Sequence, residues 1–171
     1  MFRVRYSAEP VSLVDGPIFQ VAWVVDDIDA SERWFTETLG IPSFHRFSDV
    51  HFGPNLCRYR GEPADFVIEV GIGYAGDQQV ELIQPVSGRN IYVEYLERSG
   101  PGLHHIAFVP EDFDAALAEG AARGMAVTQE GSFAGGAMRF AYLDGSAGGS
   151  PNIELIHMSP QMATFFDMLK Q

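Results

Sequence analysis

Four side chains that are able to bind a metal ion stand at corresponding places in the two halves of the sequence: Gln20, Glu81, His105 and Glu154. Together they offer three oxygen atoms and one nitrogen atom, a donor set that suits a divalent zinc, nickel, cobalt, manganese or iron ion. Two carboxylates neutralise the charge of such an ion, and four protein ligands leave one or two coordination positions for a substrate oxygen. The sequence therefore predicts one divalent metal ion per chain, in a catalytic site.

An internal repeat relates these residues to one another. Segment 20–30 aligns with segment 105–115, five of the 11 positions are identical, and Gln20 corresponds to His105. Each copy reads as an apolar strand, an acidic turn and the start of a helix. Repeats longer than about 50 residues are typical of duplicated domain halves rather than of solenoid units.

A second repeated motif closes each half, with Val-Glu-Leu-Ile at 80–83 and Ile-Glu-Leu-Ile at 153–156. The glutamates of the two copies are the predicted carboxylate ligands. These copies lie 12 residues closer together than the copies of the first motif. We therefore expect the first half to contain an extra loop between residues 42 and 72.

The elements that must position these side chains follow the order strand, helix, strand, strand, strand in each half. Asp27 and Asp112 are suited to cap helices that end near Leu39 and Arg123, where a glycine follows in each case. The expected strands are 18–25, 43–47 or 56–59, 67–74 and 78–84 in the first half, and 103–109, 126–129, 138–143 and 152–158 in the second. Further helices are expected at 91–98, between the halves, and at 160–170.

Side chains alternate across a strand, so parity predicts which polar residues share a face. In the first strand Gln20 and Trp23 lie on opposite faces. The apolar face that includes Trp23 suits contact with a helix. His105 occupies the face that corresponds to that of Gln20. His104 has the opposite parity and is not expected to bind the metal.

Composition limits the class of protein. The 171 residues include 11 Lys or Arg and 23 Asp or Glu, a net charge of −12, and 46% are hydrophobic. This size and apolar content fit one globular domain over residues 1–171, and the acidity argues against a nucleic-acid partner. No apolar run has the length of a signal peptide or a membrane span, so we expect a cytoplasmic protein with no membrane partner. The single cysteine, Cys57, excludes an intramolecular disulfide and is interpreted as a small buried hydrophobe.

Four segments together resemble the vicinal oxygen chelate superfamily, which includes glyoxalase I, methylmalonyl-CoA epimerase, extradiol dioxygenases and bleomycin-resistance proteins. They are 18–29, 80–85, 102–108 and 153–156. The resemblance covers residues 17 to 158 and implies an α+β fold in which two tandem β-α-β-β-β modules form a cupped mixed sheet around a metal site. It implies the metal ligands Gln20, Glu81, His105 and Glu154, and a homodimer. The parts are the first module 17–86, the linker 87–102, the second module 103–158 and the C-terminal helix 159–171.

Within that superfamily the ligand set most resembles glyoxalase I, whereas segment 92–108, with its two adjacent histidines, resembles methylmalonyl-CoA epimerase. Both enzymes move a proton next to a carbonyl through a metal-stabilised enediolate. The resemblance therefore implies a metal-dependent lyase, isomerase or epimerase that acts on a small carbonyl compound or an acyl-thioester. Glu154 is the leading candidate for the catalytic base, and Glu81 is the candidate for the opposite face of the substrate.

Two other functions share this fold. A metal-dependent dioxygenase needs two histidines and one carboxylate on iron, and here Gln20 stands in place of one of the histidines. A non-catalytic protein that binds an antibiotic or another aromatic molecule usually lacks the four ligands, which this sequence retains. Four arginines are candidates either for a clamp on a carboxylate or CoA phosphate or for surface ion pairs: Arg58, Arg60, Arg89 and Arg139.

Overall fold

The computed structural model describes residues 12–170. The strands are β1 (Gln20–Val24), β2 (Phe44–Phe52), β3 (Cys57–Tyr59), β4 (Glu62–Pro63), β5 (Phe66–Ala75), β6 (Gln78–Ser87), β7 (Gly102–Phe108), β8 (Val127–Phe133), β9 (Met138–Leu143) and β10 (Asn152–Met158). The helices are α1 (Ile28–Leu39), α2 (Ile91–Ser99), α3 (Phe113–Ala122) and α4 (Pro160–Leu169). Over these residues, no helix has the length and apolar character that crossing a membrane requires.

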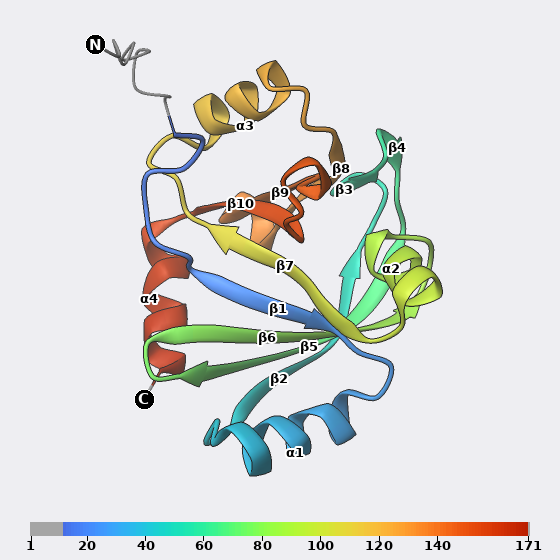
Figure 1. The fold of residues 1–171 in the computed structure, drawn as a ribbon, viewed down its shortest axis with the longest axis vertical. Coiled ribbons are helices and arrows are strands. Elements are labelled where there is room, and N and C mark those ends of the chain that lie inside the picture. Colours follow the sequence, from blue (N-terminus) through green and yellow to red (C-terminus); the bar gives the residue numbers. More distant parts are fainter. Residues whose placement is uncertain (1–11, 171) are drawn as a thin grey trace, which may run out of the picture.

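One curled, mixed sheet contains all ten described strands, in the order β2-β5-β6-β1-β7-β10-β9-β8-β3-β4. The pairs β1–β6 and β7–β10 are parallel, and the other neighbours are antiparallel. The two repeated strands β1 and β7 lie side by side at the centre. Helices α1 and α3 lie at opposite ends of the molecule, and α4 runs along the side of the sheet (Figure 1). The α+β fold predicted from the sequence, with its C-terminal helix, is confirmed.

Local signals determine where the helices begin and end. The carboxylate of Asp27 accepts a hydrogen bond from the Ala30 backbone N–H at 2.9 Å, and Asp112 caps α3 in the same way. Gly40 ends α1 in the left-handed conformation at φ 72°, which glycine adopts without strain. The ring of Trp23 packs edge-on against Phe35 of α1 at 5.1 Å, so the face of β1 opposite to Gln20 is the one that contacts the helix.

The first half does contain extra residues between 42 and 72, but they form strands rather than a loop alone. Both alternatives for the second strand form, as parts of β2 and as β3, and β4 completes a short hairpin with β3. The hairpin pairs with β8, at the edge of the sheet opposite to β2. Phe52 contacts the rings of Phe133 and Phe140 at 6.0 and 5.5 Å, and Cys57 is buried. Burial of Phe52 and Cys57 against strands of the other half explains why this segment pairs with β8, which no local pattern indicates.

Candidate metal centre and adjoining cavity

The structure brings the four predicted ligands together around one nitrogen atom. His105 Nε2 lies 3.2 Å from Gln20 Oε1, 3.2 Å from Glu154 Oε2 and 3.4 Å from Glu81 Oε2. We refer to these four residues as the quartet. They stand on four neighbouring strands, β6, β1, β7 and β10, none of which is at an edge of the sheet.

Two alanines make room for the carboxylates. In the parallel pair β1–β6, Ala22 stands opposite Glu81, and in the parallel pair β7–β10, Ala107 stands opposite Glu154. Both alanines are fully buried. They are identical residues of the repeat, so the internal symmetry places the two carboxylates as well as their supporting strands.

Burial and neighbouring charges have opposite effects on the pKa of His105 at this centre. The side chain of His105 is fully buried, and those of Glu154 and Glu81 are 5% and 15% exposed. Burial lowers the pKa of His105, but the Glu154 and Glu81 carboxylates outweigh this effect and raise it to about 9. Burial also raises the pKa of Glu81. Without a metal, His105 is therefore a cation held between two carboxylates at neutral pH.

A chain of hydrogen bonds orients Gln20. Its Nε2 donates to Gln79 Oε1 at 2.6 Å, Gln79 Nε2 donates to the hydroxyl of Tyr74 at 2.7 Å, and that hydroxyl donates to the Phe166 carbonyl of α4 at 3.0 Å. Because Gln20 Nε2 is used in this way, Gln20 Oε1 faces His105. Sequence reasoning missed Gln79, although it stands two positions before Glu81 and therefore shares its face of β6.

The regular alternation of β7, which was expected to point His104 and His105 to opposite faces, does not hold. The pairing of β1 with β7 shifts between Ala22 and Trp23, and this bulge inserts one extra residue in β7. As a result His104 is buried beside His105, with the two Nδ1 atoms 2.9 Å apart. Burial lowers the pKa of His104 well below its ordinary value and keeps it neutral. A hydrogen bond to the second ring nitrogen fixes the orientation of the His105 ring.

A cavity of about 720 Å³ adjoins the quartet at Glu81. Residues of β2, β5, β9 and α4 line it, and most of them are apolar, among them Phe47, Val70, Ile72, Met138 and Phe166. Met138 therefore forms part of the cavity wall, whereas Phe140 and Tyr142 of the same strand belong to the buried core. This volume lies within the range of small-molecule sites in proteins.

The family model of the Glyoxalase/Bleomycin resistance protein/Dioxygenase superfamily matches residues 19–142. The chain belongs to this superfamily. Among solved structures, the methylmalonyl-CoA epimerase of Mycobacterium tuberculosis is 20% identical and has a TM-score of 0.62, over 90% of this chain and 95% of that one. No curated protein sequence matches the chain.

Two further solved structures share this superfamily fold. A Streptomyces coelicolor methylmalonyl-CoA epimerase variant in complex with 2-nitronate-propionyl-CoA is 22% identical, with a TM-score of 0.62 over 87% of this chain and 96% of that one. A hypothetical protein from Bacillus halodurans is 16% identical, with a TM-score of 0.59 over 82% of this chain and 92% of that one. At these identities the likeness establishes the fold alone.

The quartet of this superfamily member fits a divalent ion by its donor atoms. Ligand atoms that each lie about 2.1 Å from one octahedral ion are about 3 Å from one another, close to the separations around His105 Nε2. Over residues 12–170, however, no group of three or more His, Cys, Asp or Glu is already arranged to hold an ion. Since a histidine ligand must be neutral, binding of an ion would have to displace the extra proton that the raised pKa of His105 implies.

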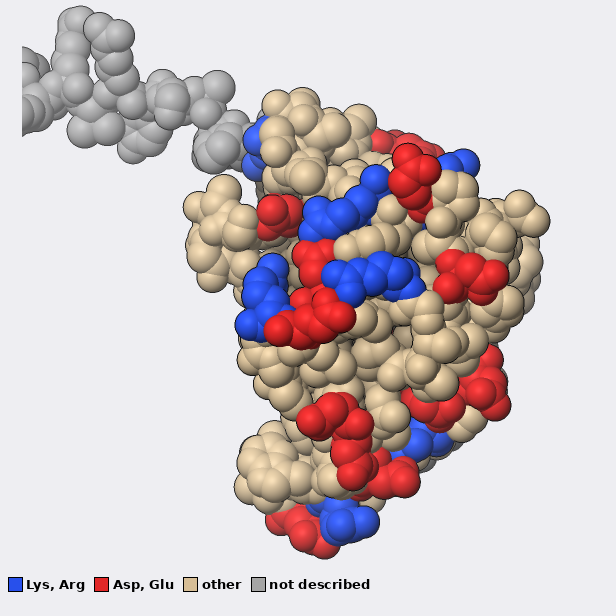
Figure 2. Space-filling view, turned by 90° about the vertical axis from the view of Figure 1, so that its right-hand side faces the viewer, with Lys and Arg blue, Asp and Glu red and all other residues tan. Residues whose placement is uncertain are grey.

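Two of the four candidate clamp arginines are paired with carboxylates on α2. Arg60 contacts Glu94 at 2.5 Å and Arg89 contacts Glu97 at 2.6 Å. On the face drawn in Figure 2, blue Lys and Arg side chains have red Asp and Glu side chains beside them and form no patch of one sign. Arg60 and Arg89 are therefore partners in surface ion pairs, which is one of the two alternatives expected from the sequence.

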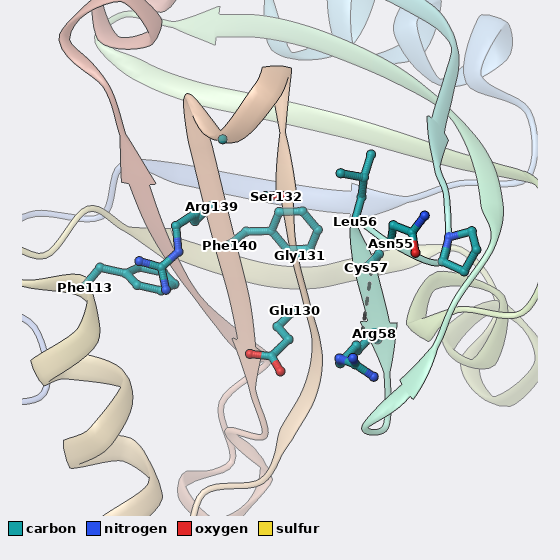
Figure 3. Close-up of a pocket in the computed structure, with 12 residues that line it drawn as sticks. Asn55, Leu56, Cys57, Arg58, Phe113, Glu130, Gly131, Ser132, Arg139 and Phe140 are labelled. Carbon is teal, nitrogen blue, oxygen red and sulfur yellow. Dashed lines mark hydrogen bonds between the residues drawn. The ribbon is translucent and has the colours of Figure 1, made fainter.

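The other two candidate arginines line a second pocket, of about 580 Å³, between β3 and the β8–β9 pair (Figure 3). Arg139 lies over the ring of Phe113 at 4.6 Å and contacts Asp114 at 2.9 Å, and Arg58 lines the side formed by β3. None of the described residues that line this pocket belongs to the quartet. The four arginines therefore do not gather at one site, and Arg139, like Arg60 and Arg89, is in an ion pair.

Proposed function

We propose that this chain is a metal-dependent lyase, isomerase or epimerase that moves a proton on the carbon next to a carbonyl group. The observation that supports it is the convergence of Glu81 and Glu154, from repeat-related strands, on His105. Two carboxylates at one buried centre provide a proton acceptor and a proton donor on different sides of a bound substrate.

Gln20, Glu81, His105 and Glu154 are the proposed ligands of one divalent ion. When bound, the ion supplies positive charge that stabilises the negative charge developing on the substrate carbonyl oxygen. The chain holds these side chains on rigid strands, and the burial of Gln20 and His105 keeps water away from them.

Glu81 is the carboxylate that the cavity reaches. It lines the cavity, whereas the side chain of Glu154 is 5% exposed. We therefore assign the proton transfer to and from substrate in the cavity to Glu81, and assign Glu154, the leading base in the sequence-based prediction, to the opposite face.

The test is exchange of a substrate proton for deuterium. The metal-loaded protein is incubated in deuterated water with thiol adducts of oxoaldehydes, methyl-branched acyl-CoA thioesters and uncharged hydroxyketones, and label at the carbon next to the carbonyl is followed by NMR. We expect exchange with one of these classes. In Glu81→Gln the amide keeps an oxygen ligand but accepts no proton, so exchange should fall by about a hundredfold or more while metal remains bound.

Glu97→Gln is the matched control, because the same change is made at an exposed carboxylate on α2. It should leave exchange unchanged. Equal exchange by Glu81→Gln and the native chain would contradict the assigned role of Glu81. Turnover that consumed oxygen would replace the proposal with the dioxygenase alternative.

A further inference from the structure

We infer that the cavity beside Glu81 takes an uncharged carbonyl compound with an apolar body, rather than a thioester of coenzyme A or another phosphate-bearing molecule. This inference rests on the proposed function and specifies its substrate class. Three features of the cavity support it: an apolar wall, a neutralised arginine and an acidic rim.

Helix α4 contributes three of the nine apolar side chains that line the cavity. Met162, Phe165 and Phe166 of this helix line the cavity opposite the sheet. The ring of Phe165 packs against that of Phe47 of β2 at 6.0 Å, which fixes the helix over the cavity. A ligand that fills this space therefore places most of its surface against aromatic and thioether side chains, which favour apolar groups.

Arg46 is the only Lys or Arg among the described residues that line the cavity. Its guanidinium contacts Asp29 at 2.7 Å, Glu32 at 2.8 Å and Glu69 at 3.9 Å. The hydrogen bond with Glu32 is the largest of several effects that raise the pKa of Arg46. One positive charge thus faces three negative charges, so Arg46 offers no net positive charge to a phosphate or carboxylate.

The remaining ionisable groups of the cavity add to its acidity. Asp49 lines it, and the imidazole of His51 contacts the carboxylate of Asp65 at 2.7 Å. In a chain whose net charge is −12, this local field opposes the entry of an anion. A neutral carbonyl compound is not repelled by this field, and its apolar body can pack against the apolar wall.

The test measures binding separately from turnover. The uncharged fluorophore phenylnaphthylamine is titrated into the full chain, and coenzyme A at millimolar concentration is then added as a competitor. We expect the fluorophore to bind and coenzyme A to leave it in place. Met162→Lys puts a charge in the apolar wall and should weaken fluorophore binding by about tenfold or more.

Met168→Lys is the matched control, since Met168 stands on the same helix and is 59% exposed. It should leave fluorophore binding unchanged. Displacement of the fluorophore by coenzyme A, equal binding by Met162→Lys and the native chain, or no fluorophore binding at all would overturn the inference. None of these outcomes bears on proton exchange, so a wrong substrate class is distinguishable from a wrong reaction.

Discussion

The side-chain amide of Gln20 donates a hydrogen bond to the side-chain carbonyl of Gln79 at 2.6 Å. Both side chains are buried, at 4% and 1% exposure. An amide that donates on one side is fixed on the other, so this bond determines that oxygen and not nitrogen faces His105. Gln79 therefore positions the proposed metal ligand Gln20 and is not itself a proposed ligand.

Gln79→Leu should therefore weaken metal binding. Loss of such a supporting hydrogen bond typically costs about 10-fold to 100-fold in metal affinity, and the apolar replacement keeps the strand packed. Isothermal titration with zinc or nickel measures the affinity, and thermal unfolding of the metal-free protein checks the fold. Gln78→Leu, at the partly exposed neighbour on the other face of β6, is the control. Equal affinities for both variants would show that Gln79 does not orient Gln20.

The metal-free protein should become less stable as pH rises from about 6.5 to about 9. The folded chain raises the pKa of His105 to about 9, from 6.5. Between these values the folded state holds a proton that the unfolded state has lost, so the stabilisation present below pH 6.5 disappears on passing pH 9. Urea unfolding in the presence of a chelator measures this slope. His105→Gln should abolish it, and an unchanged slope in that variant would assign the effect to other groups.

Metal affinity should change in the opposite direction over the same interval. Because a metal displaces the Nε2 proton of His105, affinity should rise with pH and level off above about pH 9. Titration in two buffers with different ionisation enthalpies counts the protons released. Near neutral pH we expect about one proton per ion, and release of none would contradict the protonated state of His105.

Cys57 should be chemically inert in the folded protein. It is 2% exposed, and burial raises its pKa to about 12. At pH 8 the thiol is therefore protonated and shielded from reagents. A disulfide reagent should label it only after urea is added. Cys57→Ser should retain proton exchange, and loss of exchange in a folded, metal-binding variant would contradict this account.

Leu82→Ala should separate packing from metal binding. Leu82 is fully buried beside Glu81 but faces α1, so its truncation should cost ~2–5 kcal/mol of unfolding free energy. Val86→Ala, at a half-exposed position of the same strand, should cost less than about 0.5 kcal/mol. Chemical unfolding measures both. Metal affinity should remain within about twofold of the native value in each.

Sequence reasoning succeeded where the signal is local. The caps Asp27 and Asp112 act on an N–H three residues away, and the strands 138–143 and 152–158 have the predicted bounds. The repeat predicted that Gln20 and His105, and likewise Glu81 and Glu154, stand on corresponding strands of the two halves. The roles of the quartet, the module boundaries, the homodimer and the cytoplasmic location remain predictions.

Reasoning failed where a distant partner decides the structure. The pairing of β3 with β8 depends on residues about 70 positions apart, and the bulge at His104 depends on the fit of β7 against β1. Strand alternation describes a regular strand and contains no information on either. The hydrogen bond from Gln20 to Gln79 likewise requires the register of two strands that are not adjacent in the chain.

The turn at residues 53–56, which joins β2 to β3, separates strands that can pair early in synthesis from a hairpin that cannot. Strands β1, β2, β5 and β6 pair with one another and are complete once residue 87 has left the ribosome. The hairpin of β3 and β4 has no partner until residues 127–133 follow. Until then its apolar side chains and strand edge are open to solvent and to other nascent chains. Pairing of the hairpin with β8 can therefore follow only after the second half is synthesised, and variants that weaken this pairing should lower the yield of folded protein.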